Sequence, residues 1–312
     1  MNDFIKFLEA GNLSASTQKY YVLHINKFLQ WYDNDAINTE KKDILKYLEH
    51  LKKNKKQQNI TRKNSLIALN HYFNFLMQNE LITSNPTSFI KIRGTKKKQI
   101  YKLFTADELA RILDDFYNIY IKNFDENHIP KNQRRQSFLS RNRNYCMLTF
   151  LIYQGLHTNE LQKITLDDID LIKASVKIRA SKKSAERKLN LKAEQIGVLM
   201  HYLQNIREQI SEFHQTENNS LFLMMPKSGK STTASKNVMN IIKPMSRQVK
   251  KISENFINFK QIRASVITLW IKTYGLRKTQ YTAGHKYIHS TETFLSNDLE
   301  SLTDDITKFN PF

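Results

Sequence analysis

The sequence predicts a mainly α-helical protein with one small β element. Only 7 Gly and 5 Pro interrupt its 312 residues, and apolar residues recur mostly at the spacing of an amphipathic helix. Between residues 175 and 191, by contrast, apolar and polar residues alternate on both sides of a polar segment, which is the pattern of a β-hairpin. The chain is long enough for two domains.

The first domain, residues 1–90, is expected to be a compact helical bundle. Ser14 or Ser16 can cap an early helix. The last helix of the bundle is expected to stop near Asn85-Pro86, because proline disfavours a helical conformation in the residue before it. Apolar stripes at helical spacing run through Tyr21–Tyr32, Ile44–Leu51 and Leu66–Leu76.

A basic linker, residues 91–102, is expected next. It holds a glycine and a run of lysines and lacks apolar periodicity, so it could follow a DNA backbone or be an ordinary solvated hinge. The lysines predicted to bind DNA here are Lys96, Lys97 and Lys98.

The second domain is assigned to residues 103–296. Thr105 and Glu108 have the spacing of a reciprocal helix cap and mark its first helix. Residues 117–140 are polar, basic and weakly periodic, and we expect a surface loop or an insertion there. The predicted hairpin follows, with lysines at its tip, and further helices continue to the end of this domain.

The net charge indicates a polyanionic partner. The chain has 49 Lys and Arg against 29 Asp and Glu, a formal net charge of +20, and residues 1–100 alone hold 17 basic and 8 acidic residues. Such an excess repels itself unless a polyanion neutralises it, which makes double-stranded DNA the first candidate. An AT-rich genome, which favours lysine codons, is the alternative explanation.

Neither a cofactor nor a metal is expected. The sequence contains no phosphate-binding glycine loop, and its nine His residues show no recognisable metal-ligand spacing. The single cysteine, Cys146, indicates a reducing compartment. No apolar stretch could span a bilayer, and the N-terminus lacks the pattern of a signal peptide. We therefore expect a cytoplasmic protein without a membrane partner.

Several short motifs follow one another along the chain in a specific order, although each is weak by itself. They are Asn85-Pro86, Leu103-Phe104-Thr105, Gly155-Leu156-His157-Thr158-Asn159-Glu160-Leu161, Asp168-Ile169-Asp170, Lys260-Gln261-Ile262-Arg263, Gly284-His285 and Ser290-Thr291. In this order the chain resembles tyrosine recombinases of the phage integrase and Xer type over nearly its whole length. The resemblance implies an N-terminal SAM-like core-binding bundle and a C-terminal domain of the tyrosine recombinase catalytic type.

The resemblance also implies a reaction without metal or nucleotide, in which a tyrosine hydroxyl attacks DNA and forms a 3′-phosphotyrosine bond. In the family, two arginines, a hairpin lysine acting as general acid and two His-like residues surround the phosphate. Elementary chemistry agrees with this set, since the reaction needs fixed cations, a proton donor and an in-line nucleophile.

Part of the family's set is retained here. The resemblance assigns the second arginine to Arg263 and the later histidine to His285. The hairpin lysine is Lys182 or Lys183, and we favour Lys182, with Lys183 as a further DNA contact. A phosphate contact is expected for Arg263 and His285, and the alternative is a hydrogen-bond network that only holds the domain together.

The other family positions are substituted. His157 stands in the place of the first arginine, and a histidine cannot present a bidentate fork to two phosphate oxygens. Lys260 replaces the histidine of the His-x-x-Arg element and is a poor general base. Phe294, nine residues after His285, falls at the nucleophile's position and has no hydroxyl. Ordinary structural roles, such as core filling by Phe294, are the simplest explanation of these three residues.

The sequence thus favours a DNA-binding protein of this family that has lost the tyrosine chemistry, acting with an active recombinase or as a homo-oligomer on DNA. An engineered Tyr-to-Phe change is a further possibility, although it would not explain His157. One alternative is an active, metal-independent DNA strand-exchange recombinase that uses another hydroxyl. The other is a protein-interaction module whose C-terminal tail, residues 297–312, contacts a neighbouring protomer or is simply frayed. Candidate hydroxyls for the first alternative belong to Tyr281, Tyr287, Ser290, Thr293 and Ser296.

Overall fold

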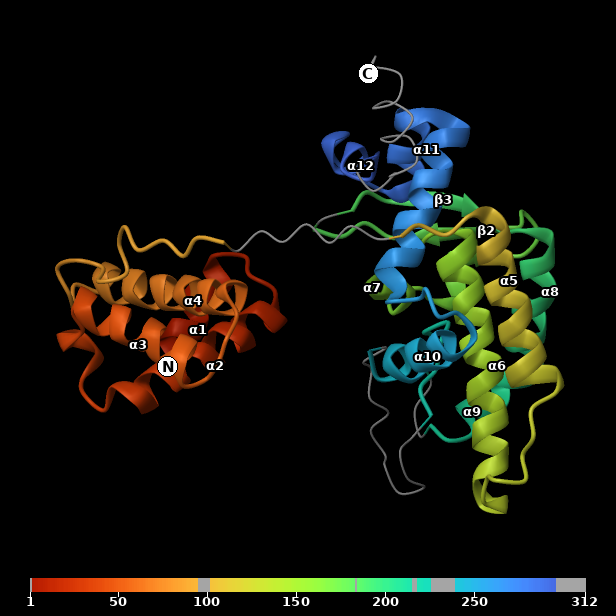
Figure 1. Cartoon of the computed structure of the whole chain (residues 1–312), viewed down its shortest axis with the longest axis horizontal. Coiled ribbons are helices and arrows are strands. Elements are labelled where there is room, and N and C mark those ends of the chain that lie inside the picture. Colours follow the sequence, from red (N-terminus) through yellow and green to blue (C-terminus); the bar gives the residue numbers. More distant parts are fainter. Residues whose placement is uncertain (1, 95–101, 183, 215–217, 226–238, 296–312) are drawn as a thin grey trace, which may run out of the picture. The chain divides into compact units, whose positions relative to one another are not determined.

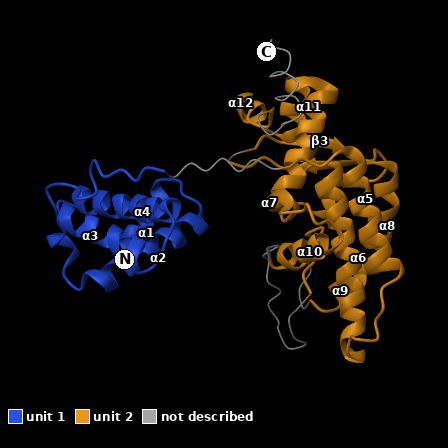
Figure 2. Ribbon diagram, in the orientation of Figure 1, with its two compact units in different colours: residues 1–99 blue, residues 100–312 orange. Residues whose placement is uncertain are grey.

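The protein folds into two compact units, residues 1–99 and 100–312 (Figure 2). Both are mainly helical, and the second also contains a small antiparallel sheet (Figure 1), which confirms the predicted fold class. No helix in the described parts of the chain is long and apolar enough to cross a membrane. The structure is a computed structural model, and it describes residues 2–94, 102–182, 184–214, 218–225 and 239–295.

The first unit is a helical bundle with an aromatic core. Of the two candidate caps of its second helix, Ser14 is the cap, because its side chain accepts a hydrogen bond from the backbone nitrogen of Thr17. In the core, the ring of Phe28 meets the rings of Tyr47 and Phe73 edge to face. The elements are α1 (Asn2–Ala10), α2 (Ala15–Tyr32), η1 (Ala36–Asn38), α3 (Lys41–Lys53) and α4 (Asn59–Gln78).

The packed part of this unit extends beyond residue 90, where we expected the linker to begin. Asn85 Nδ2 donates to Asn74 Oδ1 near the end of α4, at 2.7 Å. Ile92 packs against the core of the bundle, and Asn59 Nδ2 at the start of α4 donates to the carbonyl oxygen of Arg93, at 3.0 Å. The segment after Asn85 is therefore fastened to α4 at both ends. The predicted DNA-binding lysines Lys96, Lys97 and Lys98 lie outside the described residues.

The second unit has the long helix α6 (Lys131–Tyr153) in its core, where Leu148 and Phe150 are fully buried. Its first helix begins at the predicted reciprocal cap, since Thr105 and Glu108 each accept a hydrogen bond from the other's backbone nitrogen. The remaining helical elements are α5 (Ala106–Tyr117), η2 (Asn118–Lys122), α7 (Thr158–Leu161), η3 (Leu166–Asp168), α8 (Ala193–His201), η4 (Tyr202–Arg207), α9 (Glu208–Ser211), α10 (Met239–Ile252), α11 (Phe259–Ala283) and α12 (His289–Glu292).

Residues 117–140 are largely helical, so the expectation of a surface loop was wrong. Helical turns of η2 cover the start of this segment, and α6 already begins at Lys131. The segment shows no apolar stripe because residues 131–138, the first turns of α6, are exposed or only partly buried. Just beyond the segment, the buried Arg141 pairs with Glu126 at 2.8 Å, and its guanidinium carbon lies 3.6 Å from the centroid of the Phe124 ring.

The predicted hairpin between residues 175 and 191 is present. Strand β2 (Ser175–Ile178) pairs with β3 (Arg187–Asn190) in antiparallel register, with Val176 opposite Leu189. A third strand, β1 (Ile169–Asp170), lies on the other side of β2, which gives the sheet order β1-β2-β3. Alternation along β3 buries Arg187 and Leu189 and exposes Lys188 and Asn190.

Candidate functional site

Arg263 is the central cation of the candidate site. It lies one turn into α11, which starts where the Asn258 side chain accepts hydrogen bonds from the first backbone nitrogens of the helix. Its guanidinium donates through Nη1 to the Gly155 carbonyl and through Nη2 to the Ala283 carbonyl, the latter at 3.0 Å. Burial, opposed by the charge of Glu160, lowers the pKa of Arg263 to about 10, so the group remains charged at neutral pH.

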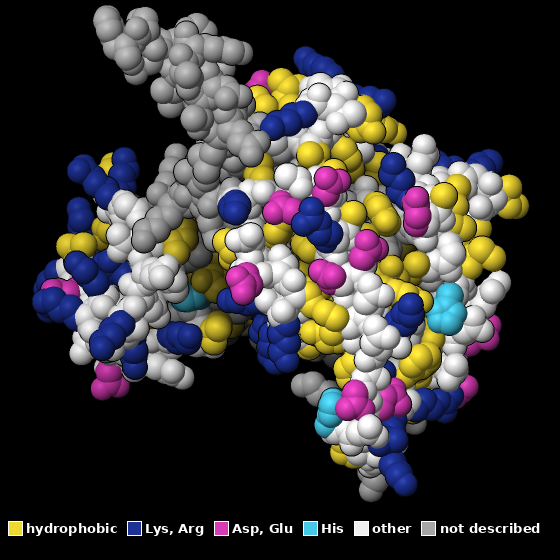
Figure 3. All heavy atoms as spheres, turned by 45° about the vertical axis from the view of Figure 1, so that its right-hand side comes forward, with side chains coloured by type: hydrophobic (Ala, Val, Ile, Leu, Met, Phe, Trp, Pro, Cys, Tyr) yellow, Lys and Arg dark blue, Asp and Glu magenta, His cyan; other side chains and the backbone are white. Residues whose placement is uncertain are grey.

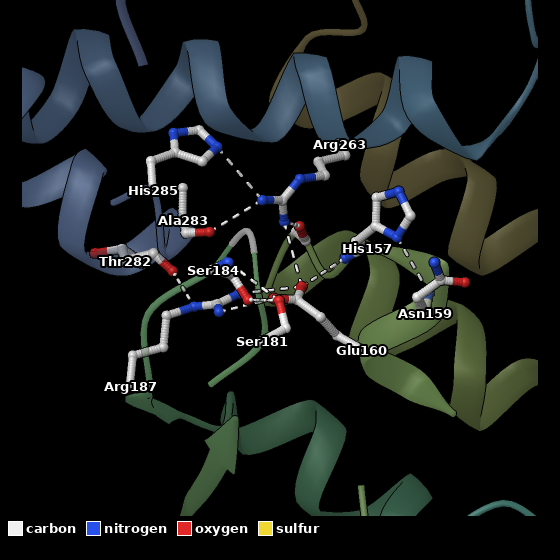
Figure 4. Close-up of polar contacts among 11 residues, drawn as sticks. His157, Asn159, Glu160, Ser181, Ser184, Arg187, Arg263, Thr282, Ala283 and His285 are labelled. Atoms are coloured by element: carbon white, nitrogen blue, oxygen red, sulfur yellow. Dashed lines mark hydrogen bonds and ion pairs between the residues drawn. The ribbon is translucent and has the colours of Figure 1, made fainter. Parts of the chain in front are cut away.

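Glu160 joins the partly buried Arg263 to a fully buried arginine, Arg187 (Figure 4). Arg187 forms a two-pronged pair with the Glu160 carboxylate, at 2.8 Å and 3.2 Å, while Arg263 Nη1 lies 3.6 Å from Glu160 Oε2. Burial alone would raise the pKa of Glu160, but the hydrogen bonds and charge of Arg187 and the charge of Arg263 lower it below its usual value. The carboxylate is therefore ionised and shared between two cations.

Sequence reasoning missed Arg187, although a signal was present. In the alternating segment of β3, Arg187 occupies the same face as Leu189 and Leu191, and that face is buried. A charged residue on a buried face requires a partner of opposite charge. The partner is Glu160, from the motif in which only His157 was considered.

His285 lies beside Arg263 as a neutral ring. Gly284, with a φ of 73°, ends α11 and turns the chain so that His285 Nε2 comes 3.5 Å from Arg263 Nη2. Burial and the positive charges of Arg263 and Arg187 lower the pKa of His285 to about 4. Because Nε2 faces a donor, the ring proton is assigned to Nδ1, which lies 2.9 Å from Thr291 Oγ1.

The ring of Phe294 stacks on His285. The two ring centroids are 5.6 Å apart and the planes are inclined by 9°. Phe294 also packs against the small apolar cluster of Ile267, Ile271 and Ala283, which explains why an aromatic side chain remains favourable there. An aromatic ring without a hydroxyl thus lies next to the Arg263–His285 pair.

His157 lies at the start of α7, close to the same network. Its Nδ1 accepts a hydrogen bond from the backbone nitrogen of Asn159 at 3.1 Å, and its own backbone nitrogen donates to Glu160 Oε2 at 2.8 Å. The histidine therefore caps a short helix with one ring nitrogen.

The lysine-bearing hairpin meets the His285 turn. Ser184 pairs with His285 as an isolated antiparallel bridge, and the Ala185 backbone nitrogen donates to the Gly284 carbonyl at 2.9 Å. Lys182 is exposed at the tip of the hairpin, two residues before this bridge. Lys183 lies outside the described residues, and Lys260 is exposed on the first turn of α11.

The hydroxyls considered as substitute nucleophiles lie in different surroundings. Tyr281 and Tyr287 are 61% and 74% exposed, and Thr293 Oγ1 donates to the Ser290 carbonyl at 2.9 Å. Ser296 lies outside the described residues. Within the described ranges, no group of three or more His, Cys, Asp or Glu residues could hold a metal ion.

A helical domain in which an arginine, a histidine and a lysine-tipped hairpin converge beside an aromatic ring has the arrangement of a tyrosine recombinase catalytic-type domain. Comparison with family models supports this class. The phage integrase N-terminal SAM-like domain matches residues 1–83, and the phage integrase family matches residues 121–300. The chain therefore belongs to the phage integrase family of tyrosine recombinases.

Individual relatives are distant. A tyrosine recombinase of Thermosipho africanus is 25% identical over 194 residues, which are 61% of this chain and 61% of that protein. Tyrosine recombinase XerD of Listeria innocua is 24% identical over an alignment that covers 100% of this chain and 98% of its own. The solved structure of XerH site-specific recombinase bound to palindromic difH substrate has a TM-score of 0.65 at 18% identity, and the match covers 96% of this chain and 82% of that one. This structural likeness shows the shared fold.

Proposed function

We propose that this protein binds double-stranded DNA as a component of a site-specific recombination system and does not itself form the phosphotyrosine bond. The observation that carries the proposal is the stacking of the Phe294 ring on His285, beside Arg263, with ring centroids 5.6 Å apart. An aromatic ring at that place corresponds to the nucleophile of the family, and without an oxygen it cannot attack phosphorus.

DNA binding is supported by charge and by the family. The chain carries a formal net charge of +20, and its basic side chains are spread over both units on the face shown in Figure 3. Solved relatives include XerH bound to its difH substrate and a lambda integrase tetramer bound to a Holliday junction. We therefore propose that this chain assembles on DNA with further copies or with an active recombinase, in the cytoplasm. Most of the affinity would come from phosphate contacts, so binding should weaken steeply with salt.

The phosphate contacts are assigned as follows. Arg263 supplies the central charge, and Lys182 at the hairpin tip reaches the backbone of the same DNA segment. Because His285 is neutral near pH 7, it adds no charge to the site, and its Nε2 faces Arg263 Nη2, so it helps to orient that guanidinium. The linker lysines Lys96, Lys97 and Lys98, together with Lys183, are proposed to follow the DNA backbone. The terminal residues 297–312 are proposed to contact a neighbouring protomer.

The loss of the first arginine supports the loss of cleavage independently of Phe294. His157 already uses Nδ1 to cap α7, so it offers at most one ring N–H to a phosphate, whereas an arginine offers a planar fork. Removing one preorganised donor to a developing oxyanion typically slows a reaction about a hundredfold to a thousandfold. One such donor, the first arginine of the family, is replaced in this chain by His157.

The proposal is tested by restoring the altered groups. Duplexes are first enriched from a random-sequence pool by binding to the protein and are then nicked, so that cleavage traps any covalent complex. The double variant His157→Arg with Phe294→Tyr is expected to give a denaturant-stable DNA adduct. The single variant Phe294→Tyr should form the adduct at least about a hundredfold more slowly than the double variant, because the arginine fork is still missing.

The matched controls are His157→Arg alone and Phe294→Leu with His157→Arg, which lack the hydroxyl and should form no adduct. If the double variant binds the enriched duplexes as well as the unaltered chain and still gives no adduct, these two positions do not line the former catalytic site. The assignment of a lost nucleophile would then be wrong.

A further inference from the structure

The hairpin that carries Lys182 is fastened to the His285 turn through its backbone. Ser184 and His285 form an isolated antiparallel bridge, and the Ala185 nitrogen donates to the Gly284 carbonyl at 2.9 Å. At the tip, the Ser181 nitrogen donates to the Ser184 carbonyl at 2.8 Å, and the two hydroxyls lie 2.9 Å apart. The tip is thus a closed turn next to the histidine (Figure 4).

The Arg187 side chain also links the Lys182 hairpin to the segment before His285, through hydrogen bonds in the interior. It is fully buried, and its Nε donates to the Thr282 carbonyl at the end of α11, at 2.8 Å. Its two Nη atoms bind the Glu160 carboxylate of α7. One guanidinium therefore joins β3, the start of α7 and the end of α11, which lie far apart in the sequence.

The absence of a side chain at Gly284 makes this contact possible. A Cβ atom added there would lie 2.3 Å from Arg187 Nη1 and 2.8 Å from its Cζ atom. Because this guanidinium is held by hydrogen bonds on both sides, it cannot move aside as the end of an exposed side chain would. The Arg187 guanidinium in this position therefore requires a glycine at residue 284.

We propose that Arg187 is a positioning residue that holds the Lys182 hairpin against the His285 turn, so that Lys182 meets the DNA phosphate bound at Arg263. The inference rests on the proposed DNA-binding function and adds a role that the family's set of site residues does not contain. Arg187 itself is buried and does not touch DNA. Its effect on phosphate binding is indirect, because it determines the position of Lys182.

The test is whether Lys182 loses its contribution to binding when Arg187 is removed. Lys182→Ala is made in the unaltered chain and in a background with Arg187→Met, where the Glu160 carboxylate keeps Arg263 as its partner. The affinity for the enriched duplexes is measured over a range of salt concentrations. In the unaltered chain, Lys182→Ala should reduce the slope of log affinity against log salt by about one, the value for one phosphate contact.

In the altered background, the same substitution should leave affinity and slope unchanged within twofold. A Lys173→Ala control, on the β1–β2 turn at the opposite end of the sheet, should behave alike in both backgrounds. Equal effects of Lys182→Ala in the two backgrounds, or no effect in the unaltered chain, would overturn the positioning role. If the unaltered chain does not bind DNA at all, the proposed function fails instead, so the two failures are distinguishable.

A second measurement uses only the unaltered chain, so it is informative even if the Arg187 variant does not fold. The Ala185 amide of the unaltered chain, which donates to the Gly284 carbonyl, should exchange its hydrogen slowly in the absence of DNA. An amide that exchanges as fast as in an unstructured peptide would show that the hairpin is not held in place, and the inference would be rejected.

Discussion

At the scale of single residues, the site combines one buried carboxylate with a fully buried arginine, a partly buried arginine and a neutral histidine. Glu160 balances part of the charge of Arg187 and Arg263, which allows the Arg187 guanidinium to lie in the interior beside a second cation. His285 is kept neutral by burial and by these cations, and it connects Arg263 to Thr291. Under the proposed function, Arg263 and Lys182 bind phosphate at neutral pH.

The lowered pKa of His285 predicts a pH dependence of stability. The folded-state pKa is about 4, below the usual 6.5 of the imidazole, so between these values the unfolded chain binds more protons than the folded chain. The contribution of the neutral ring is complete above pH 6.5 and is lost as the pH falls toward 4. At most about 3 kcal/mol of the free energy of unfolding is involved.

Nuclear magnetic resonance titration of the His285 ring in the full chain checks the pKa directly. Urea unfolding at pH 7 and pH 4.5 checks the linkage, with His285→Gln as the variant that lacks the titrating group. The unaltered chain should lose more stability than the variant on acidification. A ring that titrates near pH 6.5 would contradict the description of His285 as buried beside two cations.

At the scale of helices and strands, a glycine within α11 changes the direction of the chain ahead of the segment that carries His285 and Phe294. Gly275 has φ 76° and ψ 172°, a conformation essentially restricted to glycine, and an added Cβ would meet no atom within 4 Å. Its role is therefore conformational, because space alone would admit a larger residue. The last turns of α11 follow this break and end at Gly284.

Gly275→Ala is expected to lower the free energy of unfolding by about 1–3 kcal/mol, because alanine must adopt a strained backbone conformation there. The matched control is Gly197→Ala in α8, where an added Cβ also meets nothing within 4 Å. This control should gain roughly 0.5–1 kcal/mol, as alanine does in a helix interior. Urea unfolding measures both variants, and equal effects would show that Gly275 is not strained.

Elements with regular apolar spacing were predictable, and those with buried charges were not. The alternation around Val176 and Leu189 predicted the hairpin and placed Lys182 at its tip. The start of α6 was missed because residues 131–138 are exposed or only partly buried and carry no apolar stripe. Arg187 was missed because its partner Glu160 is 27 residues away in sequence and only the fold brings the two together. Pairings of this kind depend on tertiary structure.

At the scale of the whole molecule, a two-unit helical fold of the phage integrase family carries a formal net charge of +20, and Phe294 lies beside Arg263 and His285. The family is shown by matches to residues 1–83 and 121–300. Both units carry excess basic residues, which is suited to contact with DNA phosphates by each of them. Binding and cleavage are separable properties in such a protein, since phosphate contacts need only cations whereas cleavage also needs a hydroxyl.

The central claim is that the unaltered chain holds DNA without becoming bonded to it. The most direct measurement incubates this chain with its enriched, nicked duplexes, denatures the mixture and searches for DNA-linked peptides by mass spectrometry. We predict that all DNA is recovered free of protein, although the native complex is stable at low salt. A peptide carrying a nucleotide on Tyr281, Tyr287 or another hydroxyl would contradict the account and establish an active recombinase.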